Sequence, residues 1–111
     1  MLMTFIDPGM LRTPLDLQSS TDVMDGQGGV SQNWTTVATL FAHMEPVSAK
    51  REVRGRAREA NITHKVTIRH RGDIKNDMRL LRNGRTLMIH SVHDLDETSR
   101  YLICRCEEIE R

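Results

Sequence analysis

The sequence predicts a mainly β protein, a small antiparallel β-barrel or sandwich of about six strands with one inserted α-helix at about residues 48–60. Three observations lead to this fold class. Short runs of alternating apolar and polar residues recur through the second half of the chain, separated by turn residues. Asn83-Gly84 is a strong hairpin signal, because both residues accept the positive φ of a type I′ turn. A strand-like run at 34–44 ends at Glu45-Pro46, and helical spacing follows it directly.

A chain of 111 residues is expected to form one domain. We predict an N-terminal arm at 1–12 and a single β-barrel domain at 13–111. The arm is rich in apolar residues, which makes Phe5 and Ile6 candidates for contacts with a neighbouring subunit. Aromatic residues make up only 4% of the chain, so aliphatic side chains and the seven methionines must fill the core.

The domain begins with a predicted strand followed by a long loop. Leu15 and Leu17 alternate with polar residues, which is typical of a strand with one buried face. Residues 19–33 form the predicted loop, which is Gly-rich at its centre. Loops of this length are usually functional or disordered. We therefore expect the loop to reach a neighbouring molecule, with Asp25 and Gln27 as candidate contact residues.

The run at 34–44 predicts the next strand. It has apolar residues of both parities, which indicates a strand that is covered on both faces. Trp34 at its start is the only tryptophan of the chain. Because a buried indole contributes much apolar area, we expect Trp34 to anchor the core.

Residues 48–60 change to helical spacing, with Ala49 and Val53 at the start of a narrow small-residue stripe. Ser48 is a candidate N-cap. The opposite face carries the candidate inter-subunit or inter-ring contacts Arg51, Arg54 and Arg58. Such a face is compatible with simple solvation, with an acidic partner surface, or with nucleic acid.

The remainder of the chain predicts a meander of four strands. Val66 and Ile68 alternate with polar residues, Asn83-Gly84 joins two further strands, and a last strand runs from Tyr101 to Ile109. Inward positions on all these strands define the candidate core, which comprises Trp34, Val37, Leu40, Val66, Ile68, Leu87, Ile89, Leu102 and Cys104.

Charge is unevenly distributed along the chain, although the net charge is only +1. Residues 1–45 hold one basic and five acidic side chains, a balance of −4, and residues 46–111 hold fifteen basic and ten acidic side chains, a balance of +5. A chain with an acidic and a basic end could associate head to tail with its own copies. The alternative is two solvated faces.

The sequence contains no convincing catalytic, cofactor or metal site. Cys104 and Cys106 alternate on one strand, about 7 Å apart, which is too far for an unstrained disulfide. We expect buried thiols in a reducing compartment. The five histidines show no metal-ligand spacing, and no signal peptide or membrane-length apolar run is present.

Taken together, the ordered segments are similar to a known family. They are WTTVATLFAHMEP at 34–46, SAKREVRGRAREA at 48–60, THKVTIR at 63–69, DMR at 77–79, NGRTLMI at 83–89 and CRCEE at 104–108. In this order and spacing the chain resembles the phage head–tail joining proteins over about residues 13–108. These are the small adaptor, head-closure or stopper proteins of siphophage-like particles, including gene transfer agents.

The resemblance implies a non-enzymatic structural protein of a virion or phage-like particle, assembled in the bacterial cytoplasm. It implies a homo-oligomeric ring of six or twelve copies that continues and closes the DNA channel. The partners would be a portal-side adaptor ring and a tail-terminator or tail-tube protein, with DNA passing through without sequence-specific binding. No membrane and no cofactor is implied. The alternative is a nucleic-acid-binding, OB-like β-barrel. Its phosphate contacts would come from the predicted basic helix at 48–60 and from strand residues, namely Lys65, Arg69, Arg71, Arg79, Arg82 and Arg85.

Overall fold

The structure, a computed structural model, describes residues 7–54, 58–95 and 97–109, and for 48–54 and 58–60 it describes the backbone alone. The elements, in chain order, are a short 3-10 helix η1 (Pro8–Met10) and the strands β1 (Thr13–Met24), β2 (Val30–Arg54), β3 (Arg58–Arg69), β4 (Arg79–Arg82), β5 (Arg85–Asp94) and β6 (Tyr101–Ile109). Within these described ranges, no helix has the length and apolar composition needed to cross a bilayer.

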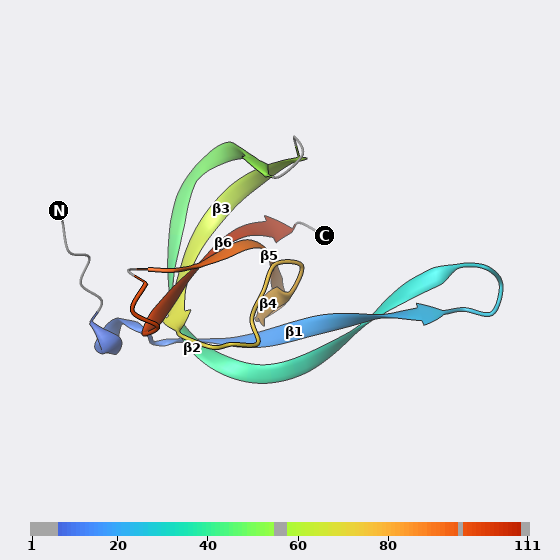
Figure 1. The fold of residues 1–111 in the computed structure, drawn as a ribbon, viewed down its shortest axis with the longest axis horizontal. Coiled ribbons are helices and arrows are strands. Elements are labelled where there is room, and N and C mark those ends of the chain that lie inside the picture. Colours follow the sequence, from blue (N-terminus) through green and yellow to red (C-terminus); the bar gives the residue numbers. More distant parts are fainter. Residues whose placement is uncertain (1–6, 55–57, 96, 110–111) are drawn as a thin grey trace.

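The six strands form one antiparallel sheet that closes on itself in the order β1-β2-β3-β6-β5-β4 (Figure 1). The short strand β4 closes the barrel by pairing with β1 over only three residues, Asp16 to Gln18. The predicted turn at Asn83-Gly84 joins β4 to β5, and both residues have the positive φ values, 49° and 79°, that a type I′ turn requires. The predicted mainly β, antiparallel fold is confirmed.

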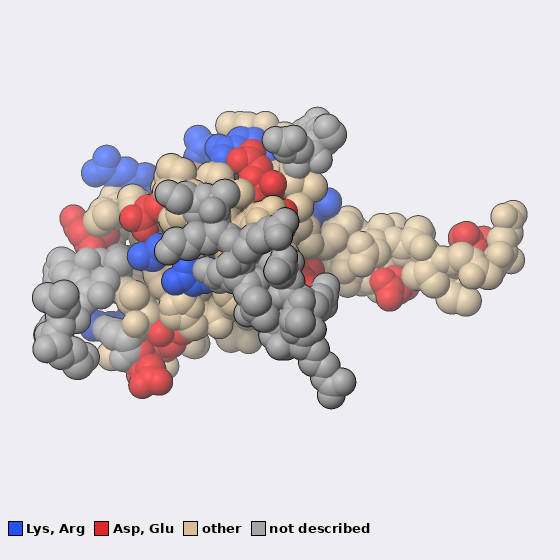
Figure 2. Space-filling model, turned by 90° about the horizontal axis from the view of Figure 1, so that it is seen from above, with Lys and Arg blue, Asp and Glu red and all other residues tan. Residues whose placement is uncertain are grey.

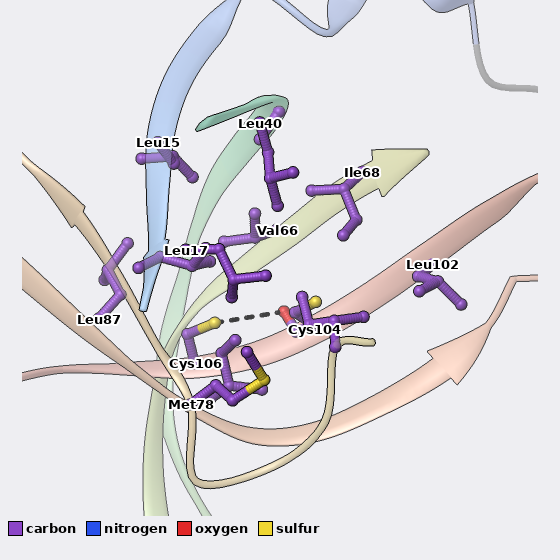
Figure 3. Close-up of a cluster of buried hydrophobic side chains, with 14 residues drawn as sticks. Leu15, Leu17, Leu40, Val66, Ile68, Met78, Leu87, Leu102, Cys104 and Cys106 are labelled. Carbon is purple, nitrogen blue, oxygen red and sulfur yellow. Dashed lines mark hydrogen bonds between the residues drawn. The ribbon is translucent and has the colours of Figure 1, made fainter. Parts of the chain in front are cut away.

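The barrel interior is filled by aliphatic and sulfur-containing side chains from all six strands (Figure 3). Ile74 and Met78, in the connection between β3 and β4, complete the cluster. Seven of the predicted core residues are buried, namely Leu40, Val66, Ile68, Leu87, Ile89, Leu102 and Cys104. The alternating pattern therefore located the inward face correctly on β3, β5 and β6.

Two predicted core residues are not buried. Val37 is 43% exposed, and Trp34 is half-buried. Val37 has the opposite parity to the inward-facing Leu40 and Ala42 and therefore points away from the interior, and Trp34 lies in the part of β2 that extends beyond the pairing with β3. A β-bulge also lies here, because Leu17 is paired with Ala38 and the next residue, Gln18, is paired with Thr36. Val37 is the extra residue, and a bulge changes which side chains face inward on the two sides of it.

The predicted helix at 48–60 is wrong. The end of β2 and the start of β3 pair as an antiparallel hairpin, with Lys50 opposite Ile62 and Arg54 opposite Arg58. The helical signal was weak, since Gly55 costs about 1 kcal/mol relative to alanine in a helix and the segment lacks a capping box. Pairing of the end of β2 with the start of β3 satisfies backbone groups of both segments, and this outweighs the helical spacing.

The predicted loop at 19–33 is also wrong in its bounds. β1 continues to Met24 and β2 begins at Val30, so the connection is a short turn over residues 25–29. The two strands leave the barrel as a long ribbon, at the right of Figure 1. Of the predicted arm at 1–12, residues 1–6 lie outside the described residues, and Leu11 packs with 9% exposure at the start of the barrel.

Candidate assembly surfaces

The most prominent feature of the molecule is the projecting two-stranded ribbon, here called the distal ribbon and defined as residues 19–36. β1 pairs with β4 only as far as Gln18, and β2 pairs with β3 only from Ala42 onward. Within the described structure, both outer edges of the distal ribbon therefore lack a neighbouring strand. An isolated two-stranded ribbon is at best marginally stable in water, and an open edge invites pairing with another chain.

A group of polar contacts fixes the root of the distal ribbon to the barrel. The Arg79 guanidinium on β4 lies over the indole of Trp34, 4.1 Å from the ring centroid. Arg79 Nε also donates to Gln18 Oε1 at 2.8 Å, and Gln18 Nε2 donates to Thr36 Oγ1 at 3.0 Å. These contacts, here called the root brace, connect β4, β1 and β2 at the position of the bulge.

The turn at the end of the distal ribbon is organised by Asp25. Its Oδ1 accepts hydrogen bonds from the backbone N–H of Gln27 at 2.8 Å and of Gly29 at 3.0 Å. These two donors lower the pKa of Asp25 below its ordinary value of 3.8. Gly26 and Gly28 both have φ of 81°, a backbone conformation that favours glycine. A Cβ on Gly29 would collide with the Asp25 carboxylate, so the turn needs this residue small.

The tip of the distal ribbon is apolar and acidic. Met24 and Val30 are directly opposite each other in the last pair before the turn, and they are 72% and 61% exposed. They are the two most exposed large hydrophobic side chains that the structure describes. Asp22 and Asp25 flank them, and the sequence has no Lys or Arg between residues 13 and 49. Figure 2 accordingly shows red but no blue atoms along the outer ribbon.

The third most exposed large hydrophobic, Phe41 at 59%, borders a groove of about 500 Å³ at the other end of the molecule. The groove is formed where the segment after η1, the middle of β2 and the end of β3 meet. Its apolar lining includes Leu11, Leu40 and Phe41, and its polar lining includes Arg69, His70 and Arg71. Arg71 is paired with Asp73 at 2.8 Å, whereas Arg69 forms no ion pair with any described residue. We call this feature the basal groove.

A separate polar cluster lies between β3, β5 and β6. Arg85 binds Glu108 through two hydrogen bonds of 2.9 and 3.0 Å and approaches His64 Nε2 at 3.4 Å. The Thr63 hydroxyl contacts His64 Nδ1 at 2.9 Å and accepts the Glu108 backbone N–H at 2.8 Å. Burial lowers the pKa of His64, and Arg85 lowers it further against the opposing effect of Glu108. The cluster lies at the end of the paired region of β3 and β6, and its contacts join the two strands there.

The two cysteines are free thiols inside the barrel. Burial raises the pKa of Cys104 to about 12 and raises that of Cys106 well above its ordinary value of 9.0. Cys106 Sγ donates to the Cys104 carbonyl at 3.7 Å (Figure 3). Thiols in this state are poor nucleophiles and poor metal ligands. In the ranges that the structure describes, no group of three or more His, Cys, Asp or Glu side chains could hold a metal ion.

The basic side chains that the OB-like alternative requires are largely engaged within the molecule. Lys65 lies 3.7 Å from Glu45, and Arg71 and Arg85 are paired with Asp73 and Glu108. Arg79 covers one face of Trp34, which a nucleic acid base would otherwise use for stacking. This arrangement favours a protein-binding surface over a single-strand-binding surface.

The structure places the predicted contact residues in different locations. Asp25 and Gln27 lie in the turn of the distal ribbon. Arg51, Arg54 and Arg58 are in the β2–β3 hairpin, with side chains outside the described set, and Phe5 and Ile6 lie outside the described residues. Sequence reasoning missed the basal groove, the root brace and the apolar tip. The stretch without Lys or Arg at 13–49 was the one signal that marked the ribbon.

Comparison with known proteins identifies the family. The sequence profile described as phage head completion protein matches residues 6–109. The chain belongs to the phage head completion protein family. Head completion proteins are structural components of virions, and this chain is accordingly a structural component of a phage-like particle, which agrees with the resemblance noted from the sequence.

A solved structure supports the fold. A chain from the virion of a native gene transfer agent particle superposes with a TM-score of 0.67 at 20% sequence identity. The match covers 89% of this head completion protein and 96% of that chain. The two chains therefore share a fold along almost their full length. The comparison with curated proteins finds no match.

Proposed function

We propose that this head completion protein forms a ring at the head–tail interface of a phage-like particle. The ring continues the DNA channel between a portal-side adaptor ring and the tail-terminator or tail-tube protein, and closes it until the tail docks. The protein acts without catalysis and without a cofactor, and it assembles in the bacterial cytoplasm. Family membership supports the location in the particle.

One observation carries the ring itself. The most exposed apolar side chains lie at two opposite ends of the elongated molecule, which measures 55 × 31 × 26 Å. An apolar patch on a small soluble protein usually marks an interaction site. Two different patches at opposite ends favour a head-to-tail contact, which repeats from copy to copy and forms a ring when the rotation between copies closes. A ring of six or twelve copies is compatible with this layout.

The second hairpin, between β2 and β3, is the proposed contact to an adjacent ring. It leaves the barrel at the top of Figure 1, away from the distal ribbon. Its sequence contains the candidate contact residues Arg51, Arg54 and Arg58. Arginine suits such a contact, because charged pairs at an interface chiefly determine partner choice and orientation.

DNA would pass through this ring without sequence-specific binding. Affinity for DNA comes largely from lysine and arginine contacts to phosphate. The net charge of the chain is only +1, and Lys65, Arg71 and Arg85 are already paired with carboxylates. A channel component of this kind lets DNA pass and does not hold it by charge.

Deleting the gene from a particle-producing strain tests the proposal. We expect heads that package DNA, lack tails and lose DNA after release, and we expect the wild-type gene supplied in trans to restore tailed particles. Cryo-electron microscopy of restored particles should show copies of this fold around the portal axis. Normal tailed particles without the protein would refute the function, and density elsewhere in the head would refute the location.

A further inference from the structure

We propose that the tip of the distal ribbon of one copy docks in the basal groove of the next copy. This inference rests on the ring proposed above and specifies its subunit contact. Met24 and Val30 would enter the apolar part of the groove beside Phe41, and Asp22 would face Arg69.

The first support is the match between the two surfaces. The tip has the two most exposed apolar side chains of the described chain, and the groove is bordered by the third, Phe41. A groove of about 500 Å³ lies within the range of about 300–1,000 Å³ that is typical of ligand pockets, so it has room for the side chains of the tip. Burying Met24, Val30 and Phe41 against one another removes the three most exposed large apolar side chains of the described residues from water in a single contact.

The second support is charge complementarity. The distal ribbon contains Asp22 and Asp25 and no Lys or Arg, a charge of −2. The basal groove is lined by Arg69, His70 and Arg71 without a carboxylate among its lining residues. Asp73 already neutralises Arg71, so Arg69 is the arginine of the groove lining that is available to a partner. Complementary charge selects the acidic tip over other apolar surfaces.

The third support is position. The distal ribbon leaves the barrel at one end of the long axis, and η1 with the end of β3 lies at the other end (Figure 1). A copy therefore presents the tip on one side and the groove on the other, and cannot use both within itself. Contacts between unlike surfaces are heterologous and propagate from copy to copy, and they form a ring when the rotation between copies closes. The contact area at one tip is small, so the interaction should be stable only when the ring is complete.

Charge exchange in assembled particles tests this contact. The variants are Asp22→Arg at the tip and Arg69→Asp in the groove, and both positions are exposed, so each variant should fold with the wild-type circular dichroism spectrum and melting temperature. Each single variant should lower the yield of DNA-filled, tailed particles by about tenfold or more, because like charges then face each other. The double variant should return to within about threefold of wild type. Asp22→Arg combined with Lys75→Asp is the matched control, because Lys75 is exposed and outside the groove, and this pair should not recover.

Co-expression of the two single variants shows whether the contact joins different copies. In a ring in which they alternate, each substituted tip meets a substituted groove of opposite charge, and each wild-type tip meets a wild-type groove, so assembly should recover. Recovery of the double variant without recovery on co-expression would mean a contact within one copy and would overturn the proposal. It is also overturned if single variants assemble normally, or if no combination recovers, which indicates a different partner for the tip. All these outcomes concern only the contact between copies. The proposed function would still hold if deletion of the gene gives heads without tails.

Discussion

The root brace gives a quantitative prediction about how the distal ribbon is held to the barrel. Trp34 is half-buried beneath Arg79. A tryptophan buries about 150–250 Å² when fully covered, so half of that area at about 25 cal/mol per Å² corresponds to about 2–3 kcal/mol. The cation–π contact adds about 0.5–1 kcal/mol. We therefore expect Trp34→Ala to lower the free energy of unfolding by about 2–4 kcal/mol.

A double-mutant cycle isolates the contact between the two side chains. Trp34→Leu and Arg79→Met keep apolar volume and remove the aromatic face and the charge, and their coupling energy should be about 0.5–1 kcal/mol. Unfolding in urea should be followed by circular dichroism, because Trp34 is the only tryptophan and its fluorescence is lost in the variants that replace it. A coupling energy below about 0.2 kcal/mol would refute the brace as an energetic contact.

The effect of the brace should also be local. Hydrogen exchange should become faster at the amides of Ser19–Met24 in Trp34→Leu, while the amides of Val66 and Ile68 in the barrel keep their relative order of protection. Uniform acceleration across the whole chain would instead mean that Trp34 supports the barrel core, as the sequence alone suggested.

Three further predictions concern the thiols, the turn and the polar cluster. Both cysteines should react with a thiol reagent at pH 8 only at the rate of global unfolding. The reason is that burial raises the pKa values of both thiols, that of Cys104 to about 12. Reaction of the native protein at the rate of a free thiol would contradict this prediction. The pKa of Asp25, followed by NMR, should lie below 3.8, and the turn amides should lose order as the pH falls through this lowered pKa. Gly29→Ala should disrupt the same turn at neutral pH. An ordinary pKa for Asp25 would show that the hydrogen bonds from the turn amides to its carboxylate are absent. Folding lowers the pKa of His64, so the unfolded chain takes up the proton first as the pH falls. The free energy of unfolding should therefore decline on acidification from about 6.5 to the folded pKa. His64→Gln should make this decline shallower, and identical pH profiles for the variant and the wild type would refute the prediction.

The barrel was predictable from the sequence because its strands obey a local rule. Val66 and Ile68 alternate with polar residues since one face of β3 contacts the core, and Asn83-Gly84 determines its turn through backbone conformation alone. The distal ribbon obeys no such rule, because a ribbon in solvent has no core face and its Ser, Thr, Gln and Asn residues read as a loop.

The candidate assembly surfaces were harder to predict for a different reason. The basal groove combines Leu11, Phe41 and Arg69, which are far apart in the sequence and meet only when the barrel closes. The root brace joins Gln18 to Arg79, separated by 61 positions. Local periodicity does not report such contacts. The uneven charge was visible in the sequence, and it was compatible with a head-to-tail association or with two solvated faces, without showing which side chains would form a contact.

A single strand, β2, connects the regions that form the proposed contacts. The same strand forms one side of the distal ribbon, part of the barrel wall, and one side of the second hairpin. It is interrupted by the bulge at Val37 and by the irregularity between Pro46 and Lys50, and bulges bend a strand and increase its twist. The directions of both hairpins are therefore fixed by the positions of these two irregularities relative to the barrel core. Beyond the root brace, the contacts described for the outer part of the distal ribbon are its own strand pairing and the Asp25 turn, and two strands alone are marginally stable in water. A neighbouring copy that binds the tip would supply the missing stabilisation, and the ribbon would then be most ordered in the complete ring.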